Sequence, residues 1–261
     1  MIHSSAVVSP SAKIGKDVEI GAFSVIGDNV TIGDGTKIGS HTLIEGFTTI
    51  GKNNKIFSHA VLGSIPQDLK YHGEKVELII GDNNIIREFT LLNPGTEGGG
   101  SVTLIGNGNL LMGYVHIAHD VKIGDSCILA NAVTLAGHVE FGNGVVVGGL
   151  TPIHQFVKVG DYAMVAGASA LSQDVPPYCL VEGNRAYIRG LNLTGLRRNI
   201  PRDEIDKLKL AYKEIFESGQ PIKDVSQILL QNSDSEYVKR FCKFILDSKR
   251  GIPFKRKING K

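Results

Sequence analysis

The 261-residue chain has no tryptophan, only three cysteines and no long apolar run. Cys127, Cys179 and Cys242 lie far apart and form no C-x-x-C pair, which predicts free thiols in a reducing compartment. No stretch approaches the roughly 20 apolar residues that cross a membrane as a helix, so no transmembrane segment is expected. Residues 1–5 lack a basic region followed by an apolar core, which argues against a secretory signal. We therefore expect a cytoplasmic protein.

The net charge of +2 conceals two parts of opposite sign. Residues 1–184 carry 10 Lys and Arg against 17 Asp and Glu, whereas residues 185–261 carry 18 against 9. A basic second part suits an anionic ligand, an acidic partner, nucleic acid or a membrane surface, and equally suits lysines spread over solvated helices. Charge alone does not choose among these.

What the chain does have is glycine, 32 residues of it, and a strict six-residue repeat. Between Ile105 and Leu171 every sixth residue is apolar, and glycine or alanine often follows it. Helices repeat every 3.6 residues and strands every 2, so neither explains this period. A parallel β-helix does, because each hexad supplies a short strand and a turn. Three hexads then form one triangular coil, and equivalent residues stack about 4.8 Å apart.

Two loops are predicted to leave this β-helix. An earlier array of the same period runs from Ile2 to Leu62 and resumes in register at Ile80, so residues 65–78 form a first loop. A second loop, residues 93–103, changes the register by one residue. Long loops on a rigid scaffold usually carry function, and the first is rich in specific polar groups.

The period changes in the last third of the chain. Two prolines at 176–177 end the repeat near residue 178, and residues 178–195 are predicted to be a connector along the outside. Three helices are predicted after Pro201 from apolar residues at helical spacing, followed by the basic tail 255–257. The apolar stripes of these helices, interpreted as packing surfaces, comprise Ile205, Leu208, Tyr212, Ile215, Phe216, Val225, Ile228, Leu229, Tyr237, Phe241, Phe244 and Ile245. We predict a β-helical domain over 1–184 and a connector with a helical domain over 185–261.

Four of the eight histidines fall in one short span: His116, His119, His138 and His154. In an 18-residue register, His119 stacks with Gly137 and Gln155, Asp120 stacks with His138 and Phe156, and His154 stacks with Ala118 and Ala136. These polar side chains are therefore expected to gather on one outer face within three coils. Scattered surface histidines would not converge in this way.

Two chemistries fit this cluster. In one, a neutral histidine takes a proton from a hydroxyl or amine nucleophile and is oriented by a carboxylate. Asp120 supplies the carboxylate for His119, but neighbouring strand residues point to opposite faces, so the chain must turn there. In the other, three histidines bind zinc and leave one position open, as in the trimeric β-helical carbonic anhydrases. Gln155 and Gly137 have no obvious role in a metal site, whereas the Gly137 N–H could stabilise an oxyanion.

The motifs at these positions resemble one family. HIAHD (116–120), ILANAVTLAGHV (128–139), PIHQF (152–156), QDVPPY (173–178) and PQDLKY (66–71) are similar to those of UDP-N-acetylglucosamine O-acyltransferases, which carry out the first step of lipid A synthesis. The resemblance covers essentially the whole chain. It implies a left-handed parallel β-helix and a homotrimer with clefts between subunits. It also implies transfer of a 3-hydroxyacyl group from acyl carrier protein to the glucosamine 3-position. We expect no cofactor, and we expect no metal because the cluster mixes histidines with Gln155 and Gly137 and the chain has no pair of cysteine ligands.

The resemblance also assigns roles to residues. His119 matches the general base, Asp120 its orienting carboxylate and Gly137 the oxyanion donor. Substrate contacts are implied for Gln67, Asp68, Lys70, His116, His138, His154, Gln155, Asn192 and Arg198, the last two at the nucleotide. Gly167 matches the position that limits acyl-chain depth and leaves room for a chain near myristoyl length. The basic domain would then serve the UDP diphosphate and the acidic carrier protein rather than nucleic acid.

The chain departs from the family pattern in places. Asn93-Pro94 stands where relatives often have His-Arg, and Thr194 and Asn199 replace charged residues near the nucleotide. Some relatives accept a 3-amino sugar, so the acceptor atom stays open. The related N-acyltransferase usually has an extra amino-terminal domain, which a repeat starting at Ile2 disfavours. A zinc-dependent lyase and a non-enzymatic scaffold are the remaining alternatives.

Overall fold

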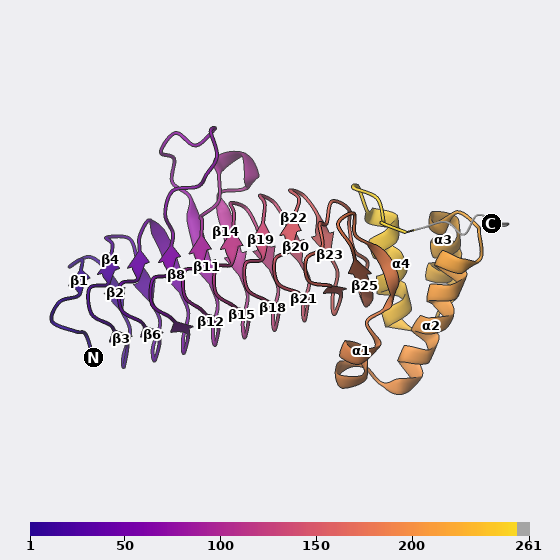
Figure 1. Cartoon of the computed structure of the whole chain (residues 1–261), viewed down its shortest axis with the longest axis horizontal. Coiled ribbons are helices and arrows are strands. Elements are labelled where there is room, and N and C mark those ends of the chain that lie inside the picture. Colours follow the sequence, from indigo (N-terminus) through magenta and orange to yellow (C-terminus); the bar gives the residue numbers. More distant parts are fainter. Residues whose placement is uncertain (255–261) are drawn as a thin grey trace.

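The computed structural model describes residues 1–254 and consists of a long triangular prism followed by four helices (Figure 1). The prism is a parallel β-helix in which successive strands belong in turn to sheet 1, sheet 2 and sheet 3. The predicted β-helix and the predicted helical segments after Pro201 are both confirmed. The basic tail 255–257 lies outside the described residues.

Sheet 1 contains β1 (Val7–Val8), β4 (Val25–Ile26), β7 (Leu43–Ile44), β10 (Val61–Leu62), β13 (Leu91–Leu92), β16 (His116–Ile117), β19 (Thr134–Leu135) and β22 (Pro152–Ile153). Sheet 2 contains β2 (Lys13–Ile14), β5 (Thr31–Ile32), β8 (Phe47–Ile50), β11 (Glu77–Ile80), β14 (Val102–Ile105), β17 (Lys122–Ile123), β20 (Glu140–Phe141) and β23 (Lys158–Val159). Sheet 3 contains β3 (Glu19–Ile20), β6 (Lys37–Ile38), β9 (Lys55–Ile56), β12 (Ile85–Ile86), β15 (Leu110–Leu111), β18 (Ile128–Leu129), β21 (Val146–Val147), β24 (Met164–Val165), β25 (Cys179–Glu182) and β26 (Tyr187–Leu191).

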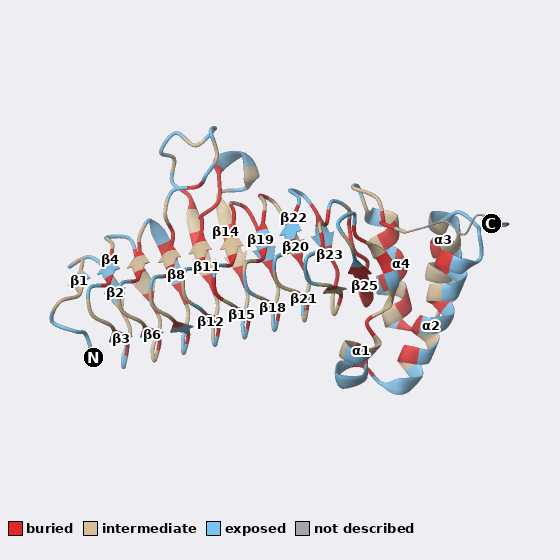
Figure 2. Ribbon diagram, viewed as in Figure 1, coloured by how far each residue is buried: buried red, intermediate tan, exposed pale blue. Residues whose placement is uncertain are grey.

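The core of the prism is a set of apolar columns that run along its axis. Ile117, Leu135 and Ile153 pair with one another in neighbouring coils of sheet 1, and all three are buried. The second residue of nearly every two-residue strand points inward in this way, and the first is more exposed (Figure 2). The six-residue period is thus the spacing between consecutive inward positions, since each coil has three sheets.

In most coils, the turn at each edge of the prism contains a residue with a left-handed backbone. The first edge, between sheets 1 and 2, includes Asp120, His138 and Phe156. The second edge, between sheets 2 and 3, includes Ser126, Gly144 and Tyr162, and the third edge, between sheets 3 and 1, includes Tyr114, Ala132, Leu150 and Ala168. Residues that follow one another along an edge therefore come from successive coils.

Two loops leave the prism on the same side, in the middle of its length (Figure 1). The first ends earlier than expected, because Leu78 is buried within β11. The second also ends early, because Thr103 belongs to β14. The Asn93 side-chain amide holds the loops together by donating to the Ser64 and Ile65 carbonyls. Asn93, one of the departures from the family pattern, is thus a buried structural residue.

The expected connector over residues 178–195 is largely regular structure instead. β25 adds to β24 in parallel, β26 returns antiparallel to β25, and α1 (Leu193–Asn199) follows. The apolar residues of β25 extend the sheet 3 ladder, and β26 covers its open edge, which would otherwise expose unpaired backbone groups. The expected domain boundary at 184–185 falls in the turn between these strands, and the division there remains a prediction.

Three longer helices close the carboxyl end of the prism: α2 (Arg202–Glu217), α3 (Ile222–Asn232) and α4 (Glu236–Asp247). Their predicted apolar stripes mostly pack inward, but Ile228 does not and is 59% exposed. Within residues 1–254, none of the helices is long and apolar enough to cross a membrane.

Candidate active site

The first edge brings His119 and Asp120 together. Both residues follow strand β16, and Asp120 has a left-handed φ of 60°, so the chain turns where the two side chains begin. Two adjacent side chains can therefore lie on the same side, which a continuous strand would forbid. His119 Nδ1 lies 2.7 Å from Asp120 Oδ2. The turn that the sequence analysis required for the pairing of His119 with Asp120 is therefore present.

Gly137 lies against the imidazole of His119, as the 18-residue register predicted. A β-carbon at position 137 would lie 2.5 Å from His119 Cε1 and 2.7 Å from Nε2. Both distances are shorter than any normal contact, so only glycine leaves the ring its place. Glycine is therefore required at position 137 to make room for the His119 ring, and not because the backbone there has an unusual φ.

The Gly137 N–H donates no hydrogen bond to any residue in the range 1–254. At the second edge, N–H groups at the same turn position are capped by the next coil, as with Asn107 to Asp125 Oδ1 and Asn143 to Asp161 Oδ1. The corresponding neighbour of Gly137 is Gln155, which makes no such bond. A donor is therefore available beside the His119 ring.

His138 packs between His119 and Phe156 on the same edge. Its ring stacks on Phe156 at 4.4 Å between centroids and meets the His119 ring edge-on at 5.1 Å. Burial lowers the pKa of His138 below the usual range, although Asp120 acts in the opposite direction. His138 is therefore held neutral at pH 7 and suits a neutral, hydroxyl-bearing ligand better than an anion.

The first loop reaches the same edge. Asp68 Oδ2 lies 3.9 Å from Nε2 of His119, the ring nitrogen that Asp120 does not use. Lys70 is close enough to His138 to affect its pKa electrostatically. Gln67 and Lys70 are exposed, so both can meet a ligand at this edge.

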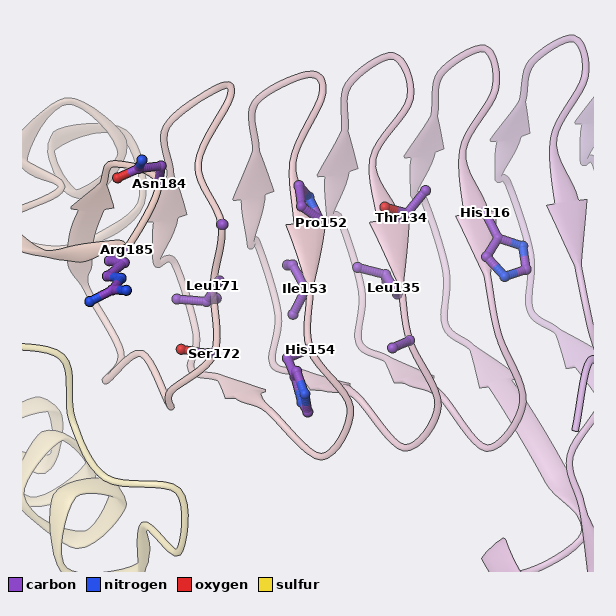
Figure 3. A pocket seen from close by; sticks show the side chains of 12 residues that line it. His116, Thr134, Leu135, Pro152, Ile153, His154, Leu171, Ser172, Asn184 and Arg185 are labelled. Atoms are coloured by element: carbon purple, nitrogen blue, oxygen red, sulfur yellow. The ribbon is translucent and has the colours of Figure 1, made fainter.

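His116 and His154 line a pocket of about 550 Å³ on the outer face of sheet 1, next to the first edge (Figure 3). Asn184 and Arg185, from the turn between β25 and β26, line its other end. Burial lowers the pKa of His116, which keeps that ring neutral as well. Gln155 is exposed beside the pocket, and its carbonyl oxygen lies 3.3 Å from His154 Nδ1.

The remaining predicted residues lie on other edges. Asn192 and Arg198 line a pocket of about 420 Å³ at the second edge. The Asn192 side chain accepts from the Gly195 N–H and donates to the Tyr162 carbonyl, so it caps α1. Gly167 lies at the third edge, where a β-carbon would come no closer than 3.3 Å to the Gly149 oxygen. The structure thus does not bring these three together with His119 within one chain.

Two residues that the sequence did not single out contact Asp120. The Thr96 N–H and hydroxyl donate to the two carboxylate oxygens at 2.9 and 2.6 Å, and the Thr103 hydroxyl accepts from the Asp120 N–H at 2.8 Å. Thr96 lies in the second loop, two residues after the atypical pair Asn93-Pro94. Its contact depends on how the second loop folds back, which no six-residue period describes.

Within residues 1–254, one group of side chains has the types and spacing for a metal ion: His119, Asp120 and His138, with ligand atoms within 4.8 Å of one another. In this structure His119 Nδ1 and Asp120 Oδ2 are hydrogen-bonded to each other, and Thr96 donates hydrogen bonds to both oxygens of the Asp120 carboxylate. Two of the three possible metal ligands, His119 and Asp120, are thus hydrogen-bonded to each other as a histidine–carboxylate pair.

Comparisons with known proteins show which family the chain resembles in sequence. The family model described as "Udp N-acetylglucosamine O-acyltransferase; Domain 2" matches residues 174–253, and the model described as "Bacterial transferase hexapeptide (six repeats)" matches 11–46 and 103–137. The chain is 69% identical over 256 residues to the acyl-[acyl-carrier-protein]–UDP-N-acetylglucosamine O-acyltransferase of Sulfurovum sp., covering 98% of each chain. It is 64% identical over 257 residues to that of Aliarcobacter butzleri, covering 98% of this chain and 99% of the relative.

Solved structures of UDP-N-acetylglucosamine acyltransferases also resemble this chain over nearly its whole length. The UDP-N-acetylglucosamine acyltransferase from Campylobacter jejuni superposes with a TM-score of 0.95 at 51% identity, covering 98% of this chain and 100% of that one. The enzyme from Moraxella catarrhalis superposes with a TM-score of 0.93 at 42% identity, covering 97% and 99%. The expected left-handed parallel β-helix with a helical carboxyl-terminal part is confirmed.

Proposed function

Because the chain belongs to the UDP-N-acetylglucosamine O-acyltransferase family, its reaction is acyl transfer from acyl carrier protein to UDP-N-acetylglucosamine in lipid A biosynthesis, and we propose that His119 is its general base. The observation that carries this role is the 2.7 Å contact between His119 Nδ1 and Asp120 Oδ2. A neutral ring that donates Nδ1–H to Asp120 keeps its lone pair on Nε2, which lies beside Asp68 and Gly137.

The chemistry follows from these positions. The 3-hydroxyl of the sugar gives its proton to His119 Nε2 while its oxygen attacks the carbonyl carbon of the 3-hydroxyacyl thioester. The Gly137 N–H donates to the oxyanion that develops. When the C–S bond breaks, the proton passes from His119 to the departing thiolate. The first-loop residues Gln67, Asp68 and Lys70, together with His138, are proposed to hold the sugar during this sequence.

The direct test mixes the purified chain with 3-hydroxyacyl carrier protein and UDP-N-acetylglucosamine and follows the sugar nucleotide by mass. A gain of one 3-hydroxyacyl group is expected, and it should persist after treatment with a chelator, since the proposed steps use no metal. A parallel reaction with the 3-amino sugar nucleotide identifies the acceptor atom. Failure to modify either acceptor would reject the proposal. The lyase alternative has no support in the comparisons.

We propose that the active unit is a homotrimer whose sites lie between subunits. In one chain, His119 is on the first edge, the Asn192 and Arg198 pocket on the second, and Gly167 on the third. The three edges of one prism point away from one another, so one substrate cannot contact His119, Arg198 and Gly167 of the same chain. It can contact all three positions only if neighbouring subunits contribute them. A glycine at position 167 would leave room for a long acyl chain in such a cleft.

Light scattering is expected to give about three times the chain mass of 28.0 kDa. A second measurement mixes His119→Ala with Arg198→Ala at a UDP-sugar concentration far below the raised KM, where each variant alone has little activity. If sites are shared, mixed trimers regain activity, because some clefts take His119 from one subunit and Arg198 from another. A fully active monomer would contradict the shared cleft.

Arg198→Ala is expected to raise the KM for the UDP-sugar about tenfold or more with little change in kcat. Arg198 is exposed in the second-edge pocket, and a guanidinium can pair with two phosphate oxygens at once. Arg197→Ala is the matched control, because Arg197 is the exposed neighbour on α1 but does not line that pocket. If only the KM for acyl carrier protein rises, Arg198 belongs to the partner surface instead.

The expected cytoplasmic location remains a proposal. It is supported by Cys127, Cys179 and Cys242, which are all buried and unpaired, as in proteins of a reducing compartment.

A further inference from the structure

We propose that Thr96 is a positioning residue of this reaction, which acts through Asp120 to hold His119 as a base. This inference goes beyond the proposed function but rests on its assignment of His119. Thr96 belongs to the second loop, which departs from the family pattern at residues 93–94, and its hydroxyl donates to Asp120 Oδ2. The loop is therefore more than a connection between β13 and β14.

The Asp120 carboxylate receives a full set of donors. It is only 3% exposed, so water does not solvate its charge. The Thr96 N–H donates to Oδ1 at 2.9 Å, while Oδ2 receives both the Thr96 hydroxyl at 2.6 Å and His119 Nδ1 at 2.7 Å. A buried carboxylate keeps its charge and its orientation only when such donors are present.

The backbone of Asp120 is fixed from the other side. Its N–H donates to the hydroxyl of Thr103, which is completely buried in β14, and this bond holds the left-handed turn at Asp120. Thr103 thus fixes where the side chain starts, and Thr96 fixes where it ends. Both are required if Oδ2 is to face His119 Nδ1.

Gly99 closes the remaining space around the carboxylate. A β-carbon at position 99 would lie 2.0 Å from Asp120 Cγ, so the backbone of the short 3-10 helix Glu97–Gly99 packs directly on that group. The helix is tied to Thr96, whose carbonyl accepts from the Gly99 and Ser101 N–H groups. The second loop therefore seals Asp120 and supplies its hydrogen bonds in one unit.

Thr96→Val removes the hydroxyl and keeps the side-chain shape. We expect kcat to fall roughly 10- to 100-fold, the range for one hydrogen bond to a charged group, while the KM values change less than about twofold. Without the Thr96 hydroxyl, the negative charge of Asp120 is less well stabilised by other donors and attracts a protonated His119 ring more strongly. The inactive form, in which His119 is protonated, therefore persists to higher pH. The acid limb of kcat/KM should therefore move to higher pH. Thr96→Ser, which retains the donor, should restore both values.

Gly99→Ala tests the packing with a matched control in the same turn. Its β-carbon must displace the Asp120 carboxylate, so a loss of kcat at least as large as in Thr96→Val is expected. Gly98→Ala should behave like the wild type, because a β-carbon there meets nothing within 4 Å. Equal kcat values for the two alanine variants would overturn the role of the second loop.

A readout independent of acyl transfer separates this inference from the proposed function. In protein labelled with ¹⁵N-histidine, the His119 signal is identified by its loss in His119→Gln. The Nδ1–H proton of His119 should lie at low field in the wild type, and should shift or exchange faster in Thr96→Val but not in Thr96→Ser. If the wild type transfers no acyl group, the proposed function fails while this signal still reports on Thr96. An unchanged signal and an unchanged acid limb in Thr96→Val would refute the inference.

Discussion

His119→Ala is expected to lower kcat by about two to four orders of magnitude, with little change in KM or in the assembly state. A sugar hydroxyl is a poor nucleophile at neutral pH, so its proton must leave as the C–O bond forms. His119 has the Asp120 carboxylate on Nδ1, and its Nε2 lies beside Gly137. Steady-state kinetics with saturating acyl carrier protein measure the effect.

Three further histidine variants test whether His119 or His138 is the general base. His119→Gln should be no better than the alanine variant, because an amide does not accept a proton. His138→Ala should mainly raise the KM for the sugar nucleotide, since His138 packs between two rings and stays neutral. His3→Ala is the control and should have wild-type kinetics, because His3 is exposed and its ring hydrogen-bonds to Ser5, far from the first-edge site. More than a tenth of wild-type kcat in His119→Ala, with an inactive His138→Ala, would move the base to His138.

Gly137→Ala should lower kcat about 100-fold or more while the protein still folds. The new β-carbon would lie 2.5 Å from His119 Cε1, so the ring must move by about 1 Å, and a misplacement of this size can cost about 100-fold. The same methyl group would crowd the N–H that is proposed to meet the oxyanion. The effect should appear in kcat, because the sugar contacts of the first loop are untouched.

Gly27→Ala provides the control for Gly137→Ala. Gly27 follows β4 in sheet 1 at the same edge, several coils away, and a β-carbon there meets Glu45 Cα at 3.3 Å. Near-normal activity and melting temperature are expected for this variant. If Gly137→Ala retained wild-type kcat, the imidazole would have room that the structure does not give it, and the oxyanion role of Gly137 would have to be abandoned.

The sequence alone determined the β-helix and the contents of the His119 column. A strict six-residue period is typical of a parallel β-helix, in which residues 18 apart are neighbours, so the repeat itself predicts that Gly137 lies beside His119. The helices after Pro201 were predictable for the same reason, since their apolar residues repeat at helical spacing. Local periodicity determined contacts wherever the chain repeats itself.

Contacts outside the repeat depended on the tertiary structure. Thr96 reaches Asp120 because the second loop folds back over the first edge, and β26 covers the end of sheet 3 by pairing with β25. No period in the sequence encodes either contact. The position of Arg198 at the second edge was likewise hidden, because spacing gives the column of a residue only while the coils are regular, and Arg198 follows the repeat. Loops and chain ends break that regularity, and there only packing and hydrogen bonding decide which residues meet.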